Sequence, residues 1–182
     1  MGDGDVKLVT RLVMGFLVAA ALVGLVACAS DHDAPPAEPS FYNSLASADA
    51  KVDASMAASM ISGYRTNNGL SSVQVDPELL KLAQTLAQAI AVRDKLEHNA
   101  VRDFNARMRS SGFDPKVAAE NIGAGYHTLA QAFSGWRDSP PHRKNMLLPG
   151  ATHIGIATAY APDSKYKVFW ALILAAPDRP RG

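Results

Sequence analysis

The apolar residues of this chain change their spacing along the sequence, and that change limits the folds it can adopt. Between residues 45 and 136 the apolar side chains recur at helical spacing, whereas Ile154, Ile156 and Thr158 alternate with small residues. Residues 165–174 are rich in strand-forming types, and the preceding Ala-Pro-Asp-Ser at 161–164 is typical of a turn. Helices followed by an antiparallel hairpin predict an α+β domain rather than a doubly wound parallel sheet.

The clearest predicted helix begins at Asp76 and Pro77. Aspartate is a favourable N-cap, and proline suits the first helical position. An apolar stripe then continues through Ile90, so we expect this helix to run to about Leu96 and to place His98 at its C-terminal end. Three further helices are expected from Leu45 to Tyr64, from Val101 to Met108, and from a Thr128 cap through Trp136 to a break at Pro140.

The N-terminal segment resembles a bacterial lipoprotein signal. Residues 12–27 are apolar and uncharged after a basic start, and they are fewer than the about 20 residues that span a membrane. They lead into Leu25-Val26-Ala27-Cys28, which resembles a lipobox, whose cysteine accepts diacylglycerol. We therefore expect a signal peptide at 1–27, a lipidated Cys28 with a Pro-rich tether at 28–40, and one domain at 41–178. A plain signal peptide, or an anchor helix with an incidental cysteine, is the alternative.

Lipidation would place the protein in the cell envelope, outside the cytoplasm, with the membrane as its partner. Cys28 is the only cysteine, so a lipidated chain has no thiol left for a disulfide and depends on an ordinary core. The formal net charge is +1, and no strongly basic field is present to attract nucleic acid. Arg102, Arg107 and Arg109 lie beside acidic residues, a pattern typical of a solvated helix face.

Three side chains carry acid–base and metal-binding chemistry: His98, Glu120 and His142. Imidazole is a proton carrier near neutral pH and the commonest protein metal ligand. Two neutral imidazoles and one carboxylate make a three-ligand set with an open position, as in catalytic zinc sites. The spacing is not that of a compact helical pair such as His-Glu-x-x-His, so the residues alone leave all three as ordinary surface or core groups.

Several short motifs surround these residues in a definite order. They are Val75-Asp76-Pro77-Glu78-Leu79, Leu96-Glu97-His98-Asn99, Ala119-Glu120-Asn121-Ile122-Gly123, Trp136 to Leu147 with Ser139-Pro140-Pro141-His142-Arg143, and Ile154-Gly155-Ile156-Ala157. Together they resemble the CAP superfamily of cysteine-rich secretory proteins, insect antigen 5 and plant pathogenesis-related proteins, in a bacterial lipoprotein form. The resemblance covers roughly residues 41 to 175.

This resemblance implies an α-β-α sandwich, in which helices flank a short, mostly antiparallel sheet. It also implies a central cleft lined by His98, Glu120 and His142, which in some members bind zinc or another divalent cation. Asn121 and Ser139 are further candidates for the cleft. Many eukaryotic members have a second glutamate where this chain has Ser139, so a mechanism with two glutamates is not supported. Asn121 and Asn145 are also expected to hydrogen-bond backbone in turns.

The resemblance favours a lipid-anchored binding module over an enzyme. The expected ligand is a small molecule, a lipid or a divalent cation in the cleft, and no oligomeric state is predicted. The alternative is a metal-assisted hydrolase with His98, His142 and Glu120 as ligands, or with Glu120 as general base. One carboxylate cannot be both a tight ligand and the base for the same water. A third interpretation is that these residues only stabilise the fold.

Overall fold

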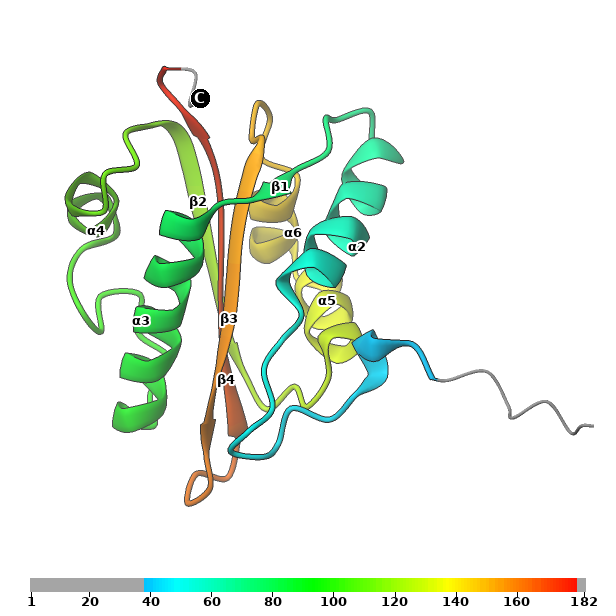
Figure 1. Cartoon of the computed structure of the whole chain (residues 1–182), viewed down its shortest axis with the longest axis vertical. Helices are drawn as coiled ribbons and strands as arrows, with labels where there is room; N and C mark the ends of the chain where they lie inside the picture. Colours follow the sequence, from blue (N-terminus) through cyan, green and yellow to red (C-terminus); the bar gives the residue numbers. More distant parts are fainter. Residues whose placement is uncertain (1–37, 180–182) are drawn as a thin grey trace, which may run out of the picture. The chain divides into compact units, whose positions relative to one another are not determined.

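The computed structural model describes residues 38–179 (Figure 1). The predicted signal peptide, Cys28 and most of the predicted tether lie outside the described residues. The described chain begins with a short 3-10 helix, η1 (Ser40–Tyr42), at the point where the tether was expected to end. Within residues 38–179, no helix combines the length and the apolar character that crossing a membrane requires.

A four-stranded sheet forms the middle layer of the described domain. Its strand order is β1 (Gln74–Val75), β3 (His153–Ala161), β4 (Lys167–Pro177) and β2 (Pro115–Ala124). β3 and β4 form the predicted hairpin, and β2 pairs with β4 on its other side, both in antiparallel register. The two-residue β1 runs parallel to β3. The sheet is therefore short and mostly antiparallel, as predicted.

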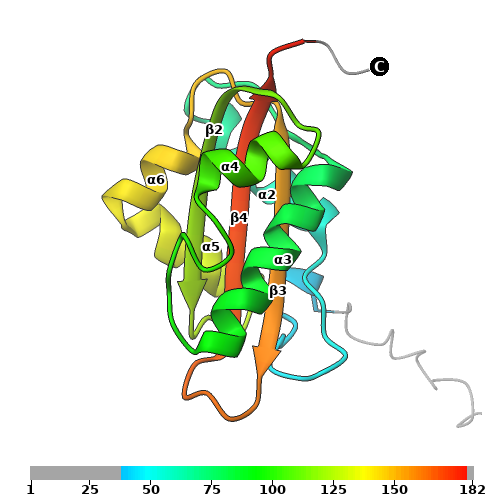
Figure 2. The same ribbon diagram turned by 90° about the vertical axis from the view of Figure 1, so that its left-hand side faces the viewer.

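Helices cover both faces of this sheet. α3 (Pro77–Arg93) and α4 (Phe104–Ser110) lie on one face, and α2 (Ala54–Thr66), α5 (Leu129–Asp138) and α6 (Pro140–Met146) lie on the other (Figure 1). Figure 2 shows α3 and α4 crossing the first face, with α6 beside the β2 edge of the sheet. The predicted α-β-α sandwich is confirmed.

β4 joins the two halves of the core because it is buried on both faces. Successive side chains of a strand point to opposite faces. Val168, Trp170, Leu172 and Leu174 belong to the core beneath α2, α5 and α6. Phe169, Ala171, Ile173 and Ala175 belong to the core beneath α3. This explains why β4 is an uninterrupted apolar run and not an alternating one.

Short-range capping sets most helix starts. The Asp76 carboxylate accepts hydrogen bonds from the backbone N–H groups of Glu78 and Leu79, and Pro77 occupies the first turn. Thr128 and Gln131 form a reciprocal capping box at the start of α5. Both predicted starts are confirmed, because each depends on residues within one helical turn.

Three local predictions are wrong. α2 begins at Ala54, after the Asp53 cap, so Leu45 precedes the helix. α3 ends at Arg93 and not near Leu96, because Asp94 adopts a left-handed conformation with φ of 49°. His98 consequently lies in the loop between α3 and α4.

The sequence predicts His142 in a turn and Glu120 in a loop or at a strand edge, and the structure corrects the first and agrees with the second alternative for Glu120. Pro140 ends α5 but also starts α6, since proline is favourable in the first turn of a helix. His142 is therefore on a helix and not in a turn. Glu120 lies inside β2, an edge strand of the sheet.

Gly155 permits α3 to lie directly against β3. A Cβ atom built at this position would lie 2.1 Å from the backbone carbonyl carbon of Leu79 and 2.3 Å from its oxygen. These are backbone atoms of a helix, so they cannot move aside as a flexible side chain would. The contact fixes how closely α3 approaches the sheet.

We predict that Gly155→Ala lowers the free energy of unfolding by about 1–3 kcal/mol or more, because the new methyl group overpacks this contact. Gly63→Ala is the matched control. Gly63 lies inside α2 with nothing within 4 Å of an added Cβ, so alanine there should raise stability by about 0.5–1 kcal/mol. Urea unfolding of both variants measures the difference. Equal effects of the two substitutions would contradict the close approach of α3.

Candidate functional site

Glu120 is the buried centre of the candidate site. Its side chain is 3 % exposed and faces the α3 and α4 side of the sheet, the side on which its strand neighbour Ile122 joins the core. Oε1 lies 2.9 Å from Nδ1 of His98, and Oε2 accepts a hydrogen bond of 2.7 Å from Nη2 of Arg107. Both carboxylate oxygens are thus engaged by side chains.

Arg107 corrects the interpretation of the 102–109 segment as a solvated face. Its side chain is 4 % exposed, and it forms an ion pair with Glu120. Nε donates to the carbonyl of Arg102, Nη2 also donates to the carbonyl of His98, and the guanidinium lies 5.4 Å from the centre of the Phe104 ring. Phe104, Arg107 and Met108 have the spacing i, i+3, i+4 of one helix face. That spacing was the available signal for the burial of Arg107.

His98 is the exposed end of this group. Its side chain is 55 % exposed although its Nδ1 contacts the buried carboxylate. An ionised carboxylate only accepts hydrogen bonds, so Nδ1 carries the proton and donates it to Glu120. In the neutral ring, Nε2 is then an acceptor. The structure brings His98 and Glu120 into contact.

His142 reaches the site from the other face. Asn121 follows Glu120 in β2 and therefore points to the α6 side, where its Nδ2 donates to the carbonyl of His142 at 3.0 Å. Nδ2 of Asn145 donates to Oδ1 of Asn121 and to the carbonyl of Glu120. These bonds tie α6 to the edge strand. Both asparagines hydrogen-bond backbone as predicted, but they join a helix to a strand and do not stabilise turns.

The His142 ring pairs with Ser139. Nδ1 of His142 lies 3.0 Å from Oγ of Ser139, and the ring is half-buried. Burial lowers the pKa of His142, and the positive charge that His98 carries when its ring is protonated lowers it further. The two imidazoles therefore lie close enough for their charges to interact, although no hydrogen bond joins His142 to Glu120.

This arrangement does not fit a cation held by all three predicted ligands. Arg107 neutralises the Glu120 carboxylate and occupies one of its oxygens, and His98 occupies the other. Nη1 of Arg107 is buried without a hydrogen-bond partner, which leaves an additional cationic donor beside the carboxylate. Among residues 38–179, no group of three His, Cys, Asp or Glu side chains is placed to hold a metal ion.

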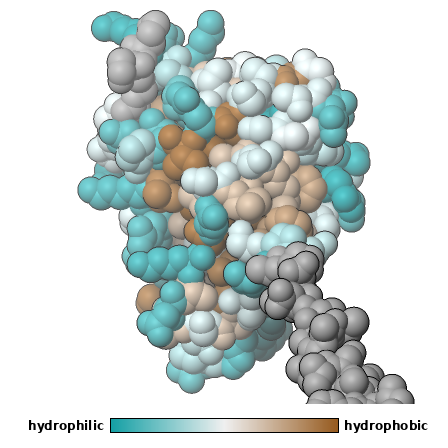
Figure 3. Space-filling model, turned by 45° about the vertical axis from the view of Figure 1, so that its right-hand side comes forward, coloured by the Kyte–Doolittle hydropathy of each residue, from teal (hydrophilic) through white to brown (hydrophobic). Residues whose placement is uncertain are grey.

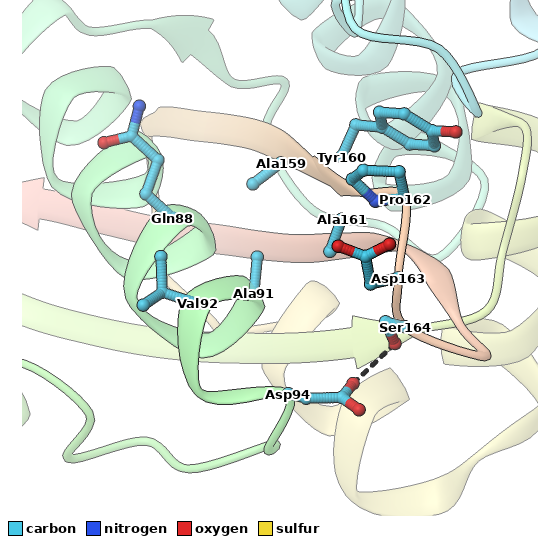
Figure 4. Close-up of a pocket in the computed structure, with 10 residues that line it drawn as sticks. All are labelled: Gln88, Ala91, Val92, Asp94, Ala159, Tyr160, Ala161, Pro162, Asp163 and Ser164. Carbon is cyan, nitrogen blue, oxygen red and sulfur yellow. Dashed lines mark hydrogen bonds between the residues drawn. The ribbon is translucent and has the colours of Figure 1, made fainter.

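Two hollows of the domain lie at the opposite edge of the sheet from β2. One, of about 430 Å³, lies between the end of α3 and the β3–β4 turn, where Ser164 donates to Asp94 (Figure 4). The other, of about 400 Å³, lies between residues 48–54, α3 and Ile156 to Tyr160 of β3. The face on the α2 side gathers apolar side chains inside a hydrophilic rim (Figure 3). None of the predicted site residues lines either hollow, so the predicted cleft stays a prediction.

Residues 58–174 match the family model described as the cysteine-rich secretory protein family, CAP. The chain belongs to this family. The matched segment runs from within α2 to within β4 and includes His98, Glu120 and His142. Among curated proteins, the CAP domain is 31 % identical over 125 residues to the uncharacterized protein YkwD of Bacillus subtilis. The alignment covers 66 % of this chain and 49 % of that protein, so the chain spans about half the length of this relative.

Solved structures show the same fold at lower sequence identity. An extracellular protein with an SCP domain from Bacillus anthracis superposes with a TM-score of 0.57 at 20 % identity, over 66 % of this chain and 39 % of that one. An outer surface protein of Borrelia burgdorferi superposes with a TM-score of 0.61 at 17 % identity, over 71 % of this chain and 98 % of that one. A cysteine-rich secretory protein of Staphylococcus aureus superposes with a TM-score of 0.54 at 15 % identity, over 66 % of this chain and 36 % of that one. These likenesses concern the CAP fold alone.

We predict that His142 contributes to a loss of stability in mild acid. The unfolded histidine titrates near pH 6.5, and its folded pKa is lower, so the unfolded state binds more protons between these two values. The stability that His142 contributes is complete above pH 6.5 and is lost as the pH falls through the folded pKa. His142→Gln should make the stability depend less on pH in this window.

Urea unfolding at a series of pH values from 7.5 to 5 measures this effect. His127→Gln, at an exposed histidine before α5, is the matched control and should retain the wild-type slope. Identical slopes for wild type and His142→Gln would show that burial of the His142 ring does not influence folding.

Proposed function

We propose that this chain is an extracytoplasmic lipoprotein whose CAP domain binds a small ligand beside His98 and His142. Acyl groups on Cys28 would hold it to the membrane, and residues 28–40 would separate the lipid from the domain. The Bacillus anthracis protein is described as extracellular and the Borrelia burgdorferi protein as an outer surface protein, and both descriptions support this location.

One observation carries the binding proposal: a buried ion pair orients an exposed imidazole. Removing two charges from water is expensive, and apolar residues of similar size often stabilise a fold equally well. A contribution to stability therefore does not by itself explain the Arg107–Glu120 ion pair. What it accomplishes is to hold Nδ1 of His98 in place, so that Nε2 is available at the surface. A preoriented polar group at the surface is what ligand recognition requires.

Binding is favoured over catalysis because Glu120 is not free to act. A general base must accept a proton from substrate or water, but both Glu120 oxygens already accept hydrogen bonds within the domain. The metal-assisted hydrolase remains the second candidate. The observation that favours a hydrolase is that the charge of His98 affects His142, so the two imidazoles are near each other. Imidazole is, with cysteine thiolate, a ligand that zinc prefers. The hydrolase would require either imidazole ligands alone or displacement of Arg107 from Glu120.

We predict that Cys28→Ser abolishes incorporation of a clickable palmitate in bacterial cells that process lipoproteins, because the acceptor thiol is lost. Ser30→Ala, two residues away, is the matched control and should retain the wild-type label. The readout is in-gel fluorescence of the purified chain. Equal labelling of wild type and Cys28→Ser would refute the lipid anchor without affecting the proposal for the domain.

We predict that the His98→Ala/His142→Ala variant loses a small molecule that the wild type retains from an envelope extract. The full chain in detergent is incubated with the extract, washed, and analysed by mass spectrometry of the released small molecules. His127→Ala, which removes an exposed histidine at another site, should retain the wild-type profile. Identical profiles for all three proteins would refute ligand binding at these imidazoles.

A further inference from the structure

We propose that Arg107 takes the place of a metal ion at Glu120, so that this carboxylate does not bind a divalent cation and instead orients His98. The proposal rests on the proposed function in one respect, namely that a ligand binds beside the imidazoles. The exclusion of a cation from Glu120 is independent of what that ligand is. It follows from the contacts of one buried arginine.

The carboxylate that would bind a cation already has a permanent cationic partner. Nη2 of Arg107 donates to Oε2 of Glu120 at 2.7 Å, and the side chains of both residues are almost fully buried. A guanidinium stays protonated in proteins, so this charge cannot be removed by a change of pH. A metal ion at Oε2 would have to displace Arg107.

Displacement would cost more than the ion pair, because Arg107 also anchors the loop that carries His98. Its Nε donates to the carbonyl of Arg102 and its Nη2 to the carbonyl of His98, while the Phe104 ring lies 5.4 Å from the guanidinium carbon. Moving the arginine would leave these two carbonyl groups without their donor. Arg107 is thus a positioning residue for His98 as well as the counterion of Glu120.

A cation at Oε1 meets a second obstacle. His98 donates its Nδ1 proton to this oxygen, so a metal there would compete with the hydrogen bond that orients the ring. The unpaired Nη1 of Arg107 adds positive charge next to the same carboxylate. At short range in a buried setting, like charges repel strongly because water does not screen them.

The group that remains available is Nε2 of His98, an acceptor in the neutral ring. A hydroxyl or an amide N–H would complement it, and neither would be repelled by Arg107. A ligand could therefore reach this nitrogen without displacing Arg107 from Glu120.

Zinc alone is the probe for this proposal. The full chain in detergent is prepared as wild type, Arg107→Met, Arg107→Lys and the Arg107→Met/Glu120→Gln double variant. Zinc binding is measured by isothermal titration calorimetry and by metal analysis after dialysis. Methionine keeps approximately the length and apolar stem of arginine but removes its charge, whereas lysine retains the charge.

We expect Arg107→Met to bind one zinc ion at least about tenfold more tightly than the wild type, because Glu120 becomes an uncompensated carboxylate beside the His98 imidazole. Arg107→Lys and the double variant should both return to the wild-type level. His98→Ala in the Arg107→Met background should remove the gain and so assign it to this site. A purely structural arginine would not produce a gain in zinc affinity that lysine reverses.

The test remains decisive if Arg107→Met does not fold, because Glu120→Gln alone then gives the answer. Glutamine keeps the shape of the side chain, and it should change the zinc affinity of the otherwise wild-type chain by less than about twofold. A large loss of zinc affinity in Glu120→Gln, or an unchanged affinity in a folded Arg107→Met variant, would overturn the proposal. Neither result depends on the small-molecule profile that tests the proposed function.

Discussion

The ion pair between Arg107 and Glu120 is the interaction on which the candidate site depends. It joins α4 to the edge strand β2, and through the carbonyl of His98 it also holds the loop between α3 and α4. Without it, Glu120 would be an uncompensated charge on the buried side of the sheet, and breaking such a pair costs about 3–5 kcal/mol. The exposed His98 ring has its orientation because these buried groups are fixed first.

A second buried arginine secures the other half of the site. Arg65 is fully buried in α2 and has only carbonyl partners: Ser71, Met146, Leu148 and Ala151. Burial lowers its pKa, because a charged guanidinium is less favourable away from water, but four hydrogen bonds to backbone offset this cost. Two of these carbonyls lie at or just after the end of α6, the helix that carries His142. The two histidines thus stand on segments that are each anchored by an arginine inside the fold.

Local signals in the sequence predicted what depends on neighbouring residues. Asp76, Pro77 and Thr128 start their helices as expected, and the 161–164 turn separates β3 from β4, because each device acts within a few residues. β2 was predicted only in part, because the sequence left Glu120 either in a loop or at a strand edge. Its partner β4 lies about 50 residues further along the chain, and its run of small residues around Glu120 lacks a clear alternation. Pairing across such a distance is a tertiary effect that local patterns do not carry.

The site was predicted in the same uneven way. Family motifs indicated His98 and Glu120, and the structure brings these two into contact. The motifs did not indicate Arg107, because three arginines among acidic residues look like a solvated surface until the helix face is known. Arg107 lies three residues after Phe104 and one before Met108, so it shares their helix face. That position indicated burial, but a charged residue on an apolar helix face is ordinarily expected to reach solvent. The end of α3 at Arg93 was equally hidden, since it depends on a left-handed Asp94 and not on glycine.

The fold of this domain therefore does not determine the chemistry of its site. Solved relatives with 15–20 % identity share the layers of this domain, and a shared fold supports many unrelated activities. The charge balance around the histidines is a property of the side chains of this chain and not of the shared fold. In this chain an arginine from α4 completes that balance from within the protein. Because Arg107 already neutralises the Glu120 carboxylate, what that carboxylate does in this chain is hold the exposed His98 ring in one orientation.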